Sequence, residues 1–256
     1  MSNVKVLVLR APGTNCDNET AFAFQQAGAV TEQHHVNRLI RKEVRLADFQ
    51  VMVVPGGFSY GDDIAAGKIQ ANEMKVRLGT DIQRFIDNGG LILGICNGFQ
   101  VLAKAGYLSK PSSEGLPLFT LTNNDSGRFE CRWIHMIADP HSNCVFTRGI
   151  ERMYLPIAHG EGKVVADAGE LAKLNVALRY CDANGQIVTT YPDNPNGSMD
   201  NIAGIADATG RVFALMPHPE RYIRGTQNPH WTQTGIAEYG DGLPIFTNAV
   251  KWVRSL

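Results

Sequence analysis

The sequence predicts an α/β fold in which an open, mostly parallel twisted sheet carries helices on both faces and has antiparallel additions. Through roughly the first hundred residues, short apolar runs alternate with helical patterns. Residues 111–210 then show short strands separated by turn signals such as Asn184-Gly185. The chain has 256 residues, of which 44% are hydrophobic, and this is enough for a sizeable core. We therefore expect residues 1–256 to form a single domain.

Glycines end the helices that we expect in the first half of the chain. Gly28 stops the first helix and Gly89-Gly90 stops the second, because glycine readily adopts the left-handed conformation that follows a helix. The short apolar runs between them are typical of buried strands. The expected elements are a strand at 4–9, a helix at 19–27, an edge strand at 30–36, a central strand at 51–54 and a helix at 73–88.

The second half begins and ends with elements of the same parallel type. A buried strand at 91–95 runs directly into the next helix. Residues 111–210 are expected to add antiparallel strands to the same domain, and the polar stretch 191–201 is expected to form a mobile loop. Another buried strand is expected at 211–216, and a helix over 244–253 closes the chain.

A lone cysteine lies at the point where the strand at 91–95 meets its helix. Cys96 is flanked by Gly94 and Gly98, which is the pattern of a nucleophile elbow with sulfur in place of oxygen. Such a turn leaves almost no room for side chains at the flanking positions and lifts the nucleophile clear of the sheet. Cys96 is therefore the candidate nucleophile. The alternative is an inert buried thiol that packs as a small hydrophobe.

The strand at 211–216 ends in a loop that presents an imidazole. Pro217 and Pro219 restrict the backbone on both sides of His218, which suits a general base with a fixed direction. A cysteine needs such a neighbour because its free thiol is mostly protonated at neutral pH. Glu220 is placed to orient the imidazole and to stabilise its charged form. A solvated surface loop is the alternative interpretation.

Attack of a thiolate on a carbonyl carbon also requires donors for the developing oxyanion. In an elbow, the N–H of the residue after the nucleophile, here Asn97, faces that oxyanion, and Gly57 after the strand at 51–54 is the natural second donor. Gly56, Phe58 and Gln100 are candidates for substrate binding. An ordinary strand-ending turn and a polar first-turn residue are the alternatives. All three motifs follow apolar strands, and ligands of open α/β sheets bind beyond the carboxyl ends of the strands.

Composition and charge exclude several functional classes. The formal net charge is −1, from 24 Lys plus Arg against 25 Asp plus Glu, so no electrostatic case exists for nucleic acid or for an anionic membrane. No apolar run approaches the about 20 residues of a membrane span, and the N-terminal residues lack a signal-peptide pattern, so we expect a cytoplasmic protein. Five scattered cysteines argue against a disulfide framework and against a zinc site, and we expect no metal.

The motifs together resemble a known family. The elbow, followed about 120 residues later by His218-Pro219-Glu220, is similar to class I, triad-type glutamine amidotransferases. Further blocks narrow the resemblance to the glutaminase subunits of phosphoribosylformylglycinamidine synthase. These blocks span residues 11–17, 55–63, 123–133 and 158–162.

The resemblance implies an enzyme of de novo purine biosynthesis. It would hydrolyse L-glutamine through a cysteine thioester and supply the ammonia to a larger, ATP-dependent synthetase subunit. The family's nucleophile, base and orienting acid fall on Cys96, His218 and Glu220. ATP and Mg would be used by the partner, with no cofactor in this chain, and a small third subunit is an open possibility.

Several polar residues in the middle of the chain fit two interpretations. Arg128, Glu130, Arg132 and Trp133 lie on an alternating strand, for which a solvated face is expected. The resemblance implies an interface role for them and for residues 159–162, which include His159 and Glu161.

Two other functions remain open. One is a different thiol hydrolase on a similar scaffold, such as a gamma-glutamyl peptidase or a cysteine protease. The other is a binding module in which the elbow survives without turnover, and the intact Cys96, His218 and Glu220 argue against it.

Overall fold

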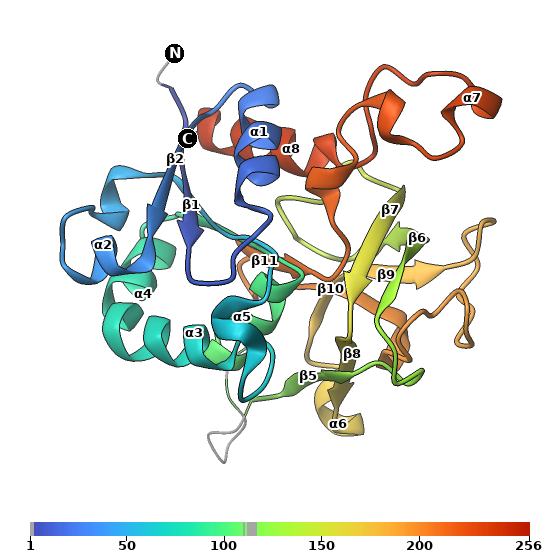
Figure 1. The fold of residues 1–256 in the computed structure, drawn as a ribbon, viewed down its shortest axis with the longest axis horizontal. Helices are drawn as coiled ribbons and strands as arrows, with labels where there is room; N and C mark the ends of the chain where they lie inside the picture. Colours follow the sequence, from blue (N-terminus) through green and yellow to red (C-terminus); the bar gives the residue numbers. More distant parts are fainter. Residues whose placement is uncertain (1–2, 110, 112–116) are drawn as a thin grey trace.

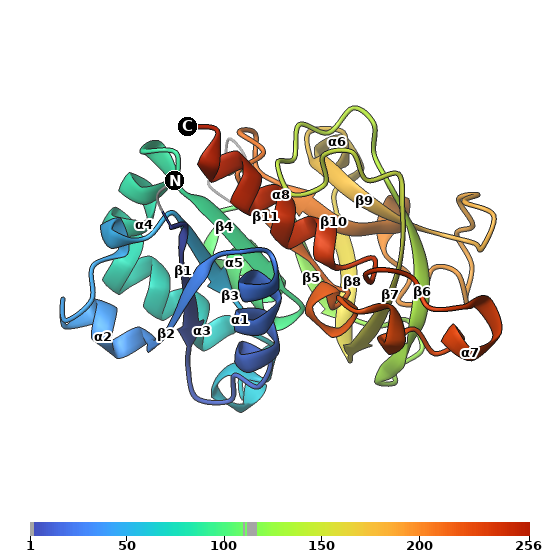
Figure 2. The same cartoon turned by 90° about the horizontal axis from the view of Figure 1, so that it is seen from above.

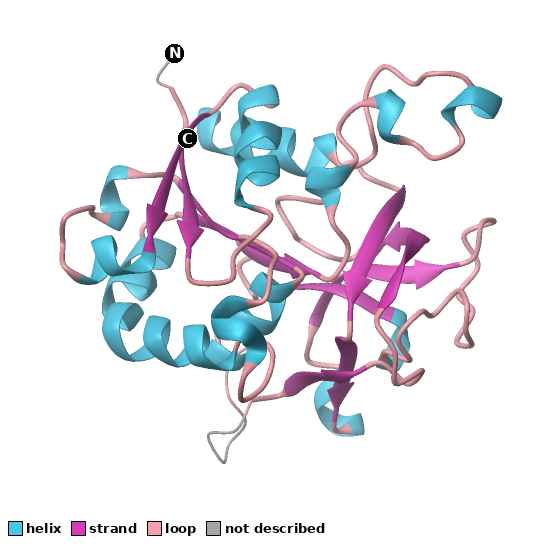
Figure 3. Ribbon diagram, in the orientation of Figure 1, coloured by secondary structure: helices cyan, strands magenta, loops and turns pink. Residues whose placement is uncertain are grey.

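The computed structural model describes residues 3–109, 111 and 117–256. A nine-stranded sheet runs through this part of the molecule (Figures 1 and 3). Its strands, in spatial order, are β2 (Val30–His35), β1 (Lys5–Arg10), β3 (Val51–Val54), β4 (Leu91–Ile95), β11 (Val212–Leu215), β10 (Ile202–Ala206), β9 (Asn175–Cys181), β6 (Glu130–Ala138) and β7 (Arg152–His159). A separate two-stranded sheet pairs β5 (Phe119–Asn123) with β8 (Glu161–Ala166).

The sheet has a parallel half and an antiparallel half. Strands β2, β1, β3, β4 and β11 pair in parallel, and β10, β9, β6 and β7 continue the same sheet in antiparallel fashion. β3, β4 and β11 are buried along their whole length, as expected for strands covered on both faces. The predicted fold class is confirmed, and part of the predicted antiparallel region, residues 112–116, lies outside the described residues.

Helices cover both faces of the parallel half (Figures 1 and 2). On one face lie α1 (Asp17–Gln26) and α8 (Leu243–Arg254), which pack through Phe24 and Phe246 with ring centroids 5.0 Å apart. On the other face lie α3 (Lys68–Glu73), α4 (Gly79–Asp87) and α5 (Asn97–Ala105). No helix among the described residues is long and apolar enough to cross a membrane.

Shorter helical segments connect these elements. They are α2 (Val36–Ile40), α6 (Ala168–Leu171), α7 (Trp231–Thr234), a π-helical turn at Met74–Leu78 and 3-10 turns at Leu46–Asp48, Ser59–Asp62, Met199–Asn201, Pro219–Arg221 and Gly225–Gln227.

Two expectations about elements were wrong. The helix expected at 73–88 begins earlier, at Lys68, and consists of α3, the π-helical turn and α4 in direct succession. The stretch 191–201, expected to be a mobile loop, is instead anchored in the interior, and Asn194, Asn196 and Ser198 are buried. Polarity alone was misleading, because short polar side chains can also satisfy buried backbone groups.

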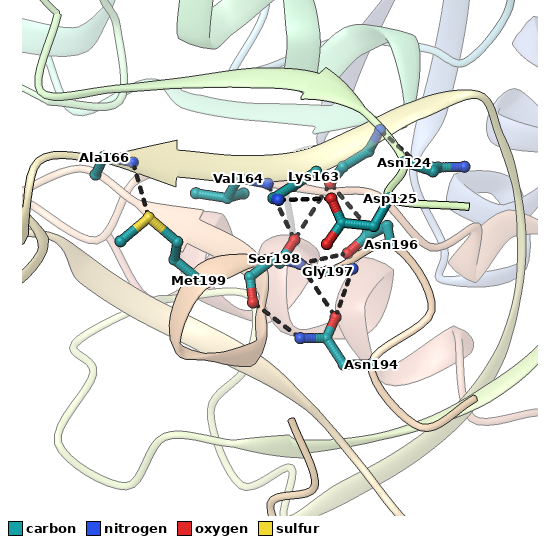
Figure 4. A network of polar contacts seen from close by, with 11 residues as sticks. Asn124, Asp125, Lys163, Val164, Ala166, Asn194, Asn196, Gly197, Ser198 and Met199 are labelled. Atoms are coloured by element: carbon teal, nitrogen blue, oxygen red, sulfur yellow. Dashed lines mark hydrogen bonds and ion pairs between the residues drawn. The ribbon is translucent and has the colours of Figure 1, made fainter. Parts of the chain in front are cut away.

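The anchoring of this stretch is a network of hydrogen bonds (Figure 4). Asn194 Oδ1 accepts from the backbone N–H groups of Gly197 and Ser198, both at 3.1 Å. Asn196 Nδ2 donates to the carbonyl of Gly162 at 2.8 Å, and Ser198 Oγ accepts from the N–H of Val164 at 3.0 Å. The stretch is thereby attached to β8.

Glycines allow α5 to pack closely on the end of the sheet. A β-carbon on Gly98 would overlap the carbonyl oxygen of Val54 at the end of β3. A β-carbon on Gly94 would lie 2.8 Å from the carbonyl oxygen of Gly98. The turn between β4 and α5 therefore requires glycine at both positions because a β-carbon would collide with neighbouring backbone atoms. The backbone conformation itself does not demand glycine there.

This packing gives a matched pair of substitutions. Gly98→Ala places a methyl group on the Val54 carbonyl, and we expect the free energy of unfolding to fall by about 1 to 3 kcal/mol. Gly79→Ala, also in a helix but with Tyr107 Oη at 3.9 Å as its near neighbour, should be neutral or stabilising by up to about 1 kcal/mol. Urea unfolding of both variants measures the difference, and equal stabilities would contradict the packing argument.

Candidate active site

Cys96 lies in the turn that ends β4 and begins α5. Its backbone has φ 51° and ψ −106°, a conformation that L-residues rarely adopt and that concentrates at functional sites. The thiol is nearly buried and donates to the carbonyl of Ala158 at 3.6 Å. The side chain is therefore held at the carboxyl edge of the sheet, against the end of β7.

His218 follows β11, the neighbour of β4, and its ring is completely enclosed. The backbone N–H of His218 donates to Pro156 of β7 at 2.9 Å. Its Nδ1 lies 2.6 Å from Glu220 Oε1, and both side chains are almost fully buried. Its Nε2 has no hydrogen-bond partner within the described part of the chain. Glu220 thus takes the Nδ1–H, and Nε2 is left for a reacting group.

The charges around His218 favour its protonated form. Burial opposes the imidazolium, but the charges of Glu220 and Cys96 and the nearness of the Cys16 thiol raise the pKa of His218 well above its ordinary value. A charged imidazole beside a cysteine stabilises the thiolate. The structure therefore brings Cys96, His218 and Glu220 together, although they come from distant parts of the sequence.

The loops after β1 and β3 are joined at the same edge. Asn15 N–H donates to Gly56 at 3.2 Å and Phe58 N–H donates to Gly13 at 2.9 Å. These bonds flank Gly57, so its own N–H points to the opposite side of the extended backbone. The N–H of Asn97, at the start of α5, has no intrahelical acceptor. Both N–H groups are available to a bound molecule.

The residues predicted to bind substrate lie in different surroundings. Gly56 is against the imidazole of His218, since a β-carbon there would lie 3.0 Å from His218 Cε1. Phe58 is 48% exposed, and its ring faces Phe129 with centroids 6.4 Å apart. Gln100 is buried, and its carboxamide accepts from Asn97 Nδ2 at 2.9 Å. It also donates to the carbonyl of Glu161 at the start of β8.

Glu130, expected on a solvated face, and His159, for which the resemblance implies an interface role, are both buried. Glu130 is 8% exposed and accepts from Ser126 Oγ at 2.7 Å, so the expected solvated face was wrong at this position. His159 is 3% exposed, and its Nδ1 lies 3.0 Å from Asn124 Oδ1. Burial lowers the pKa of His159 to about 3, and the charge of His218 acts in the same direction.

Cys16 belongs to the site and was not singled out in the sequence. Its buried thiol lies 4.0 Å from His218 Nδ1 and accepts from Arg221 Nη2 at 3.1 Å. The available signal was its position at the end of the loop that follows β1, a strand that ends at the same sheet edge. Cys16, His218 and Glu220 have ligand atoms within 4.8 Å of one another, as a metal site requires. The Arg221 guanidinium on the cysteine sulfur opposes binding of a cation there.

Comparison with known proteins agrees with this geometry. The model of the CobB/CobQ-like glutamine amidotransferase domain matches residues 3–253. The chain belongs to this family. Among curated glutamine amidotransferases, it is 56% identical over 256 residues to phosphoribosylformylglycinamidine synthase subunit PurQ of Dehalococcoides mccartyi, covering all of both chains. The subunit of the same name from Pyrococcus furiosus is 38% identical over 98% of this chain and all of its own.

Solved glutamine amidotransferases have the same fold. A chain in the structure of PurLQS from Thermotoga maritima superposes with a TM-score of 0.76 at 31% identity, covering 98% of this chain and all of that one. A putative GMP synthase subunit from Thermoplasma acidophilum, at 17% identity and a TM-score of 0.58, shares the fold.

The two buried histidines of this glutamine amidotransferase should differ in charge. At pH 6 we expect His218 to be an imidazolium, because its pKa is raised, and His159 to be neutral with its proton on Nδ1, because its pKa is near 3. Imidazole ¹⁵N NMR resolves both states, and a His159→Gln variant assigns the signals. Titration of both rings near pH 6.5 would contradict this electrostatic picture.

Proposed function

We propose that this chain is the glutaminase subunit of phosphoribosylformylglycinamidine synthase. It hydrolyses L-glutamine and supplies ammonia to an ATP-dependent synthetase subunit in de novo purine biosynthesis. One observation supports the proposed chemistry. His218 is bonded to Glu220 through Nδ1, while its unpartnered Nε2 is left for the reacting group beside a cysteine in a nucleophile elbow.

In the proposed reaction, the Cys96 thiolate attacks the side-chain carboxamide carbon of glutamine. His218 gives its proton to the leaving nitrogen, so that ammonia departs and a glutamyl thioester remains. His218 then takes a proton from water, which attacks the thioester and releases glutamate and the thiol. The N–H groups of Gly57 and Asn97 stabilise the oxyanion of each tetrahedral intermediate, and one such donor typically contributes about 3 to 4 kcal/mol.

Cys96 is a better nucleophile candidate than Cys16, although both thiols lie beside His218. Cys16 faces the Nδ1 side of the ring, where Glu220 already accepts the proton. Its backbone, with φ −104°, shows none of the strain found at Cys96. Cys96 also lies in the tight turn that joins β4 directly to α5, as in a nucleophile elbow, whereas Cys16 follows β1 only after a longer loop.

Substrate binding is proposed for Gly56, Phe58 and Gln100. The absence of a side chain at Gly56 keeps the face of the imidazole open. Phe58 and Gln100 are assigned by the resemblance of their motifs. Gln100 would contact glutamine by exchanging one of its present hydrogen bonds for the substrate.

We propose a larger synthetase subunit and a small third subunit as partners, since the solved relative from Thermotoga maritima is part of PurLQS. ATP and Mg would be used by the synthetase, and this chain would need no cofactor. We place the complex in the cytoplasm, where its five free cysteines stay reduced.

The nucleophile is tested by comparing two cysteine variants in the presence of the synthetase. Cys96→Ala should reduce glutamine-dependent synthesis at least about 10⁴-fold, because no thioester can form. Added ammonium should still support synthesis by the partner. Cys16→Ala should keep more than about a tenth of the glutaminase activity at pH 7.

Labelling with a glutamine-analogue electrophile provides the structural control for this experiment. Mass spectrometry should find the adduct on the peptide that contains Cys96. An adduct on Cys16, or an inactive Cys16→Ala beside an active Cys96→Ala, would reverse the assignment. Failure to trap a glutamyl thioester from free glutamine would favour another thiol hydrolase.

Coupling to the partner gives a further expectation. The isolated chain should release ammonia slowly, and the synthetase should raise this rate, because an uncoupled glutaminase wastes substrate. Ammonia release with and without the partner measures the effect. Equal rates would contradict the assigned division of labour.

Chelation tests the proposal that no metal takes part in this half of the reaction. Dialysis against EDTA should leave glutamine hydrolysis by this chain unchanged, since Cys96, His218 and Glu220 supply the nucleophile, the acid and the orienting group. Magnesium-dependent synthesis by the complex should be lost in the same sample. Loss of glutamine hydrolysis, restored by one added cation, would show a metal requirement.

A further inference from the structure

The Cys16 thiol lies between the imidazole of His218 and the guanidinium of Arg221. Its thiol is 1% exposed, lies 3.1 Å from Asn15 Oδ1 and accepts from Arg221 Nη2, also at 3.1 Å. The backbone is fixed as well, because Cys16 N–H donates to Gly56 at 3.2 Å. The sulfur is thus a buried acceptor in a defined position, and the Arg221 guanidinium is bound to it.

Glu220 is a second partner within reach of this guanidinium. Arg221 Nε lies 3.9 Å from Glu220 Oε1, beyond hydrogen-bonding distance. Glu220 Oε2 is buried and has no partner among the described residues. Arginine strongly favours two parallel hydrogen bonds to a carboxylate. A small movement of Arg221 would create such a pair and would draw the carboxylate charge away from His218.

We propose that Cys16 is a positioning residue, whose thiol holds the Arg221 guanidinium away from Glu220 and so reserves that carboxylate for His218. The inference rests on the proposed function, since it concerns the acid and base of the glutaminase reaction. Cys16 itself forms no bond to the substrate. Its effect reaches the reaction through the strength of the Glu220–His218 hydrogen bond.

The other groups around His218 cannot replace this role. Cys96 approaches from the elbow after β4, and His159 approaches from the end of β7 as a neutral ring. Glu220 and Arg221 belong to the same loop as His218, and Cys16 approaches from the N-terminus of α1. Among the described groups that face the imidazole, Arg221 is the cation able to compete for Glu220.

The proposal predicts a change in pH dependence. In Cys16→Ala, Arg221 loses its acceptor and pairs with Glu220, so the His218 imidazolium loses stabilisation and its pKa falls. Activity is lost at high pH when the imidazolium deprotonates, so the alkaline limb of the kcat/KM profile should move to lower pH by about one unit. Cys16→Ser keeps a hydrogen-bond acceptor and should keep the limb near its original position.

A second substitution separates positioning from packing. In the double variant Cys16→Ala, Arg221→Gln, no guanidinium remains to divert Glu220, and the alkaline limb should return to the wild-type position or above it. Arg221→Gln alone should leave the limb in place or raise it, because a nearby positive charge is removed. This single variant keeps the test decisive even if Cys16→Ala fails to fold.

The experiment uses the complex with the synthetase and follows glutamate release across pH, with melting temperatures as the control for folding. An unmoved limb in folded Cys16→Ala, an equal shift in Cys16→Ser, or a lowered limb in Arg221→Gln would overturn the inference while leaving glutamine hydrolysis intact. Glutamine hydrolysis that survives in Cys96→Ala would instead overturn the proposed function.

Discussion

The hydrogen bond between His218 Nδ1 and Glu220 Oε1 governs the chemistry of this site. It is 2.6 Å long and fully enclosed, so the carboxylate acts on the ring with little screening by solvent. Because Glu220 occupies Nδ1, Nε2 is the nitrogen left for a reacting group in the proposed reaction. The same bond explains why two thiols beside one imidazole can have different functions, one at each edge of the ring.

The two halves of the sheet contribute unequally to this arrangement. The parallel strands β3, β4 and β11 are neighbours, and they bring the loop that holds Gly56 and Gly57, Cys96 and His218 to one edge. The antiparallel half contributes backbone carbonyl groups that accept hydrogen bonds at the same edge. The carbonyls of Pro156 and Ala158 in β7 hold His218 and Cys96, respectively. The site is thus assembled at the junction between the two halves.

Much of the fold was predictable because its signals are local. Apolar runs identified the central strands, and the glycine spacing around Cys96 identified the turn whose close contact with Val54 the structure explains. The wrong predictions concern polar residues whose burial depends on non-local contacts. Asn196 looks like a surface residue in the sequence, but its hydrogen bond to the carbonyl of Gly162, far along the chain, allows its burial. Polarity cannot reveal partners that only folding brings near.

The sequence by itself determined the chemical groups, their order along the chain and the strand ends that carry them, because these depend on local spacing and side-chain type. Only the tertiary structure decided which nitrogen of His218 faces Glu220, and that the Cys16 thiol binds Arg221 beside it. The contacts of Cys16 with His218 and Arg221 join residues about 200 positions apart, and their distances are set by packing between α1 and the loop after β11. Short hydrogen bonds depend on tenths of an ångström, which no sequence pattern encodes locally.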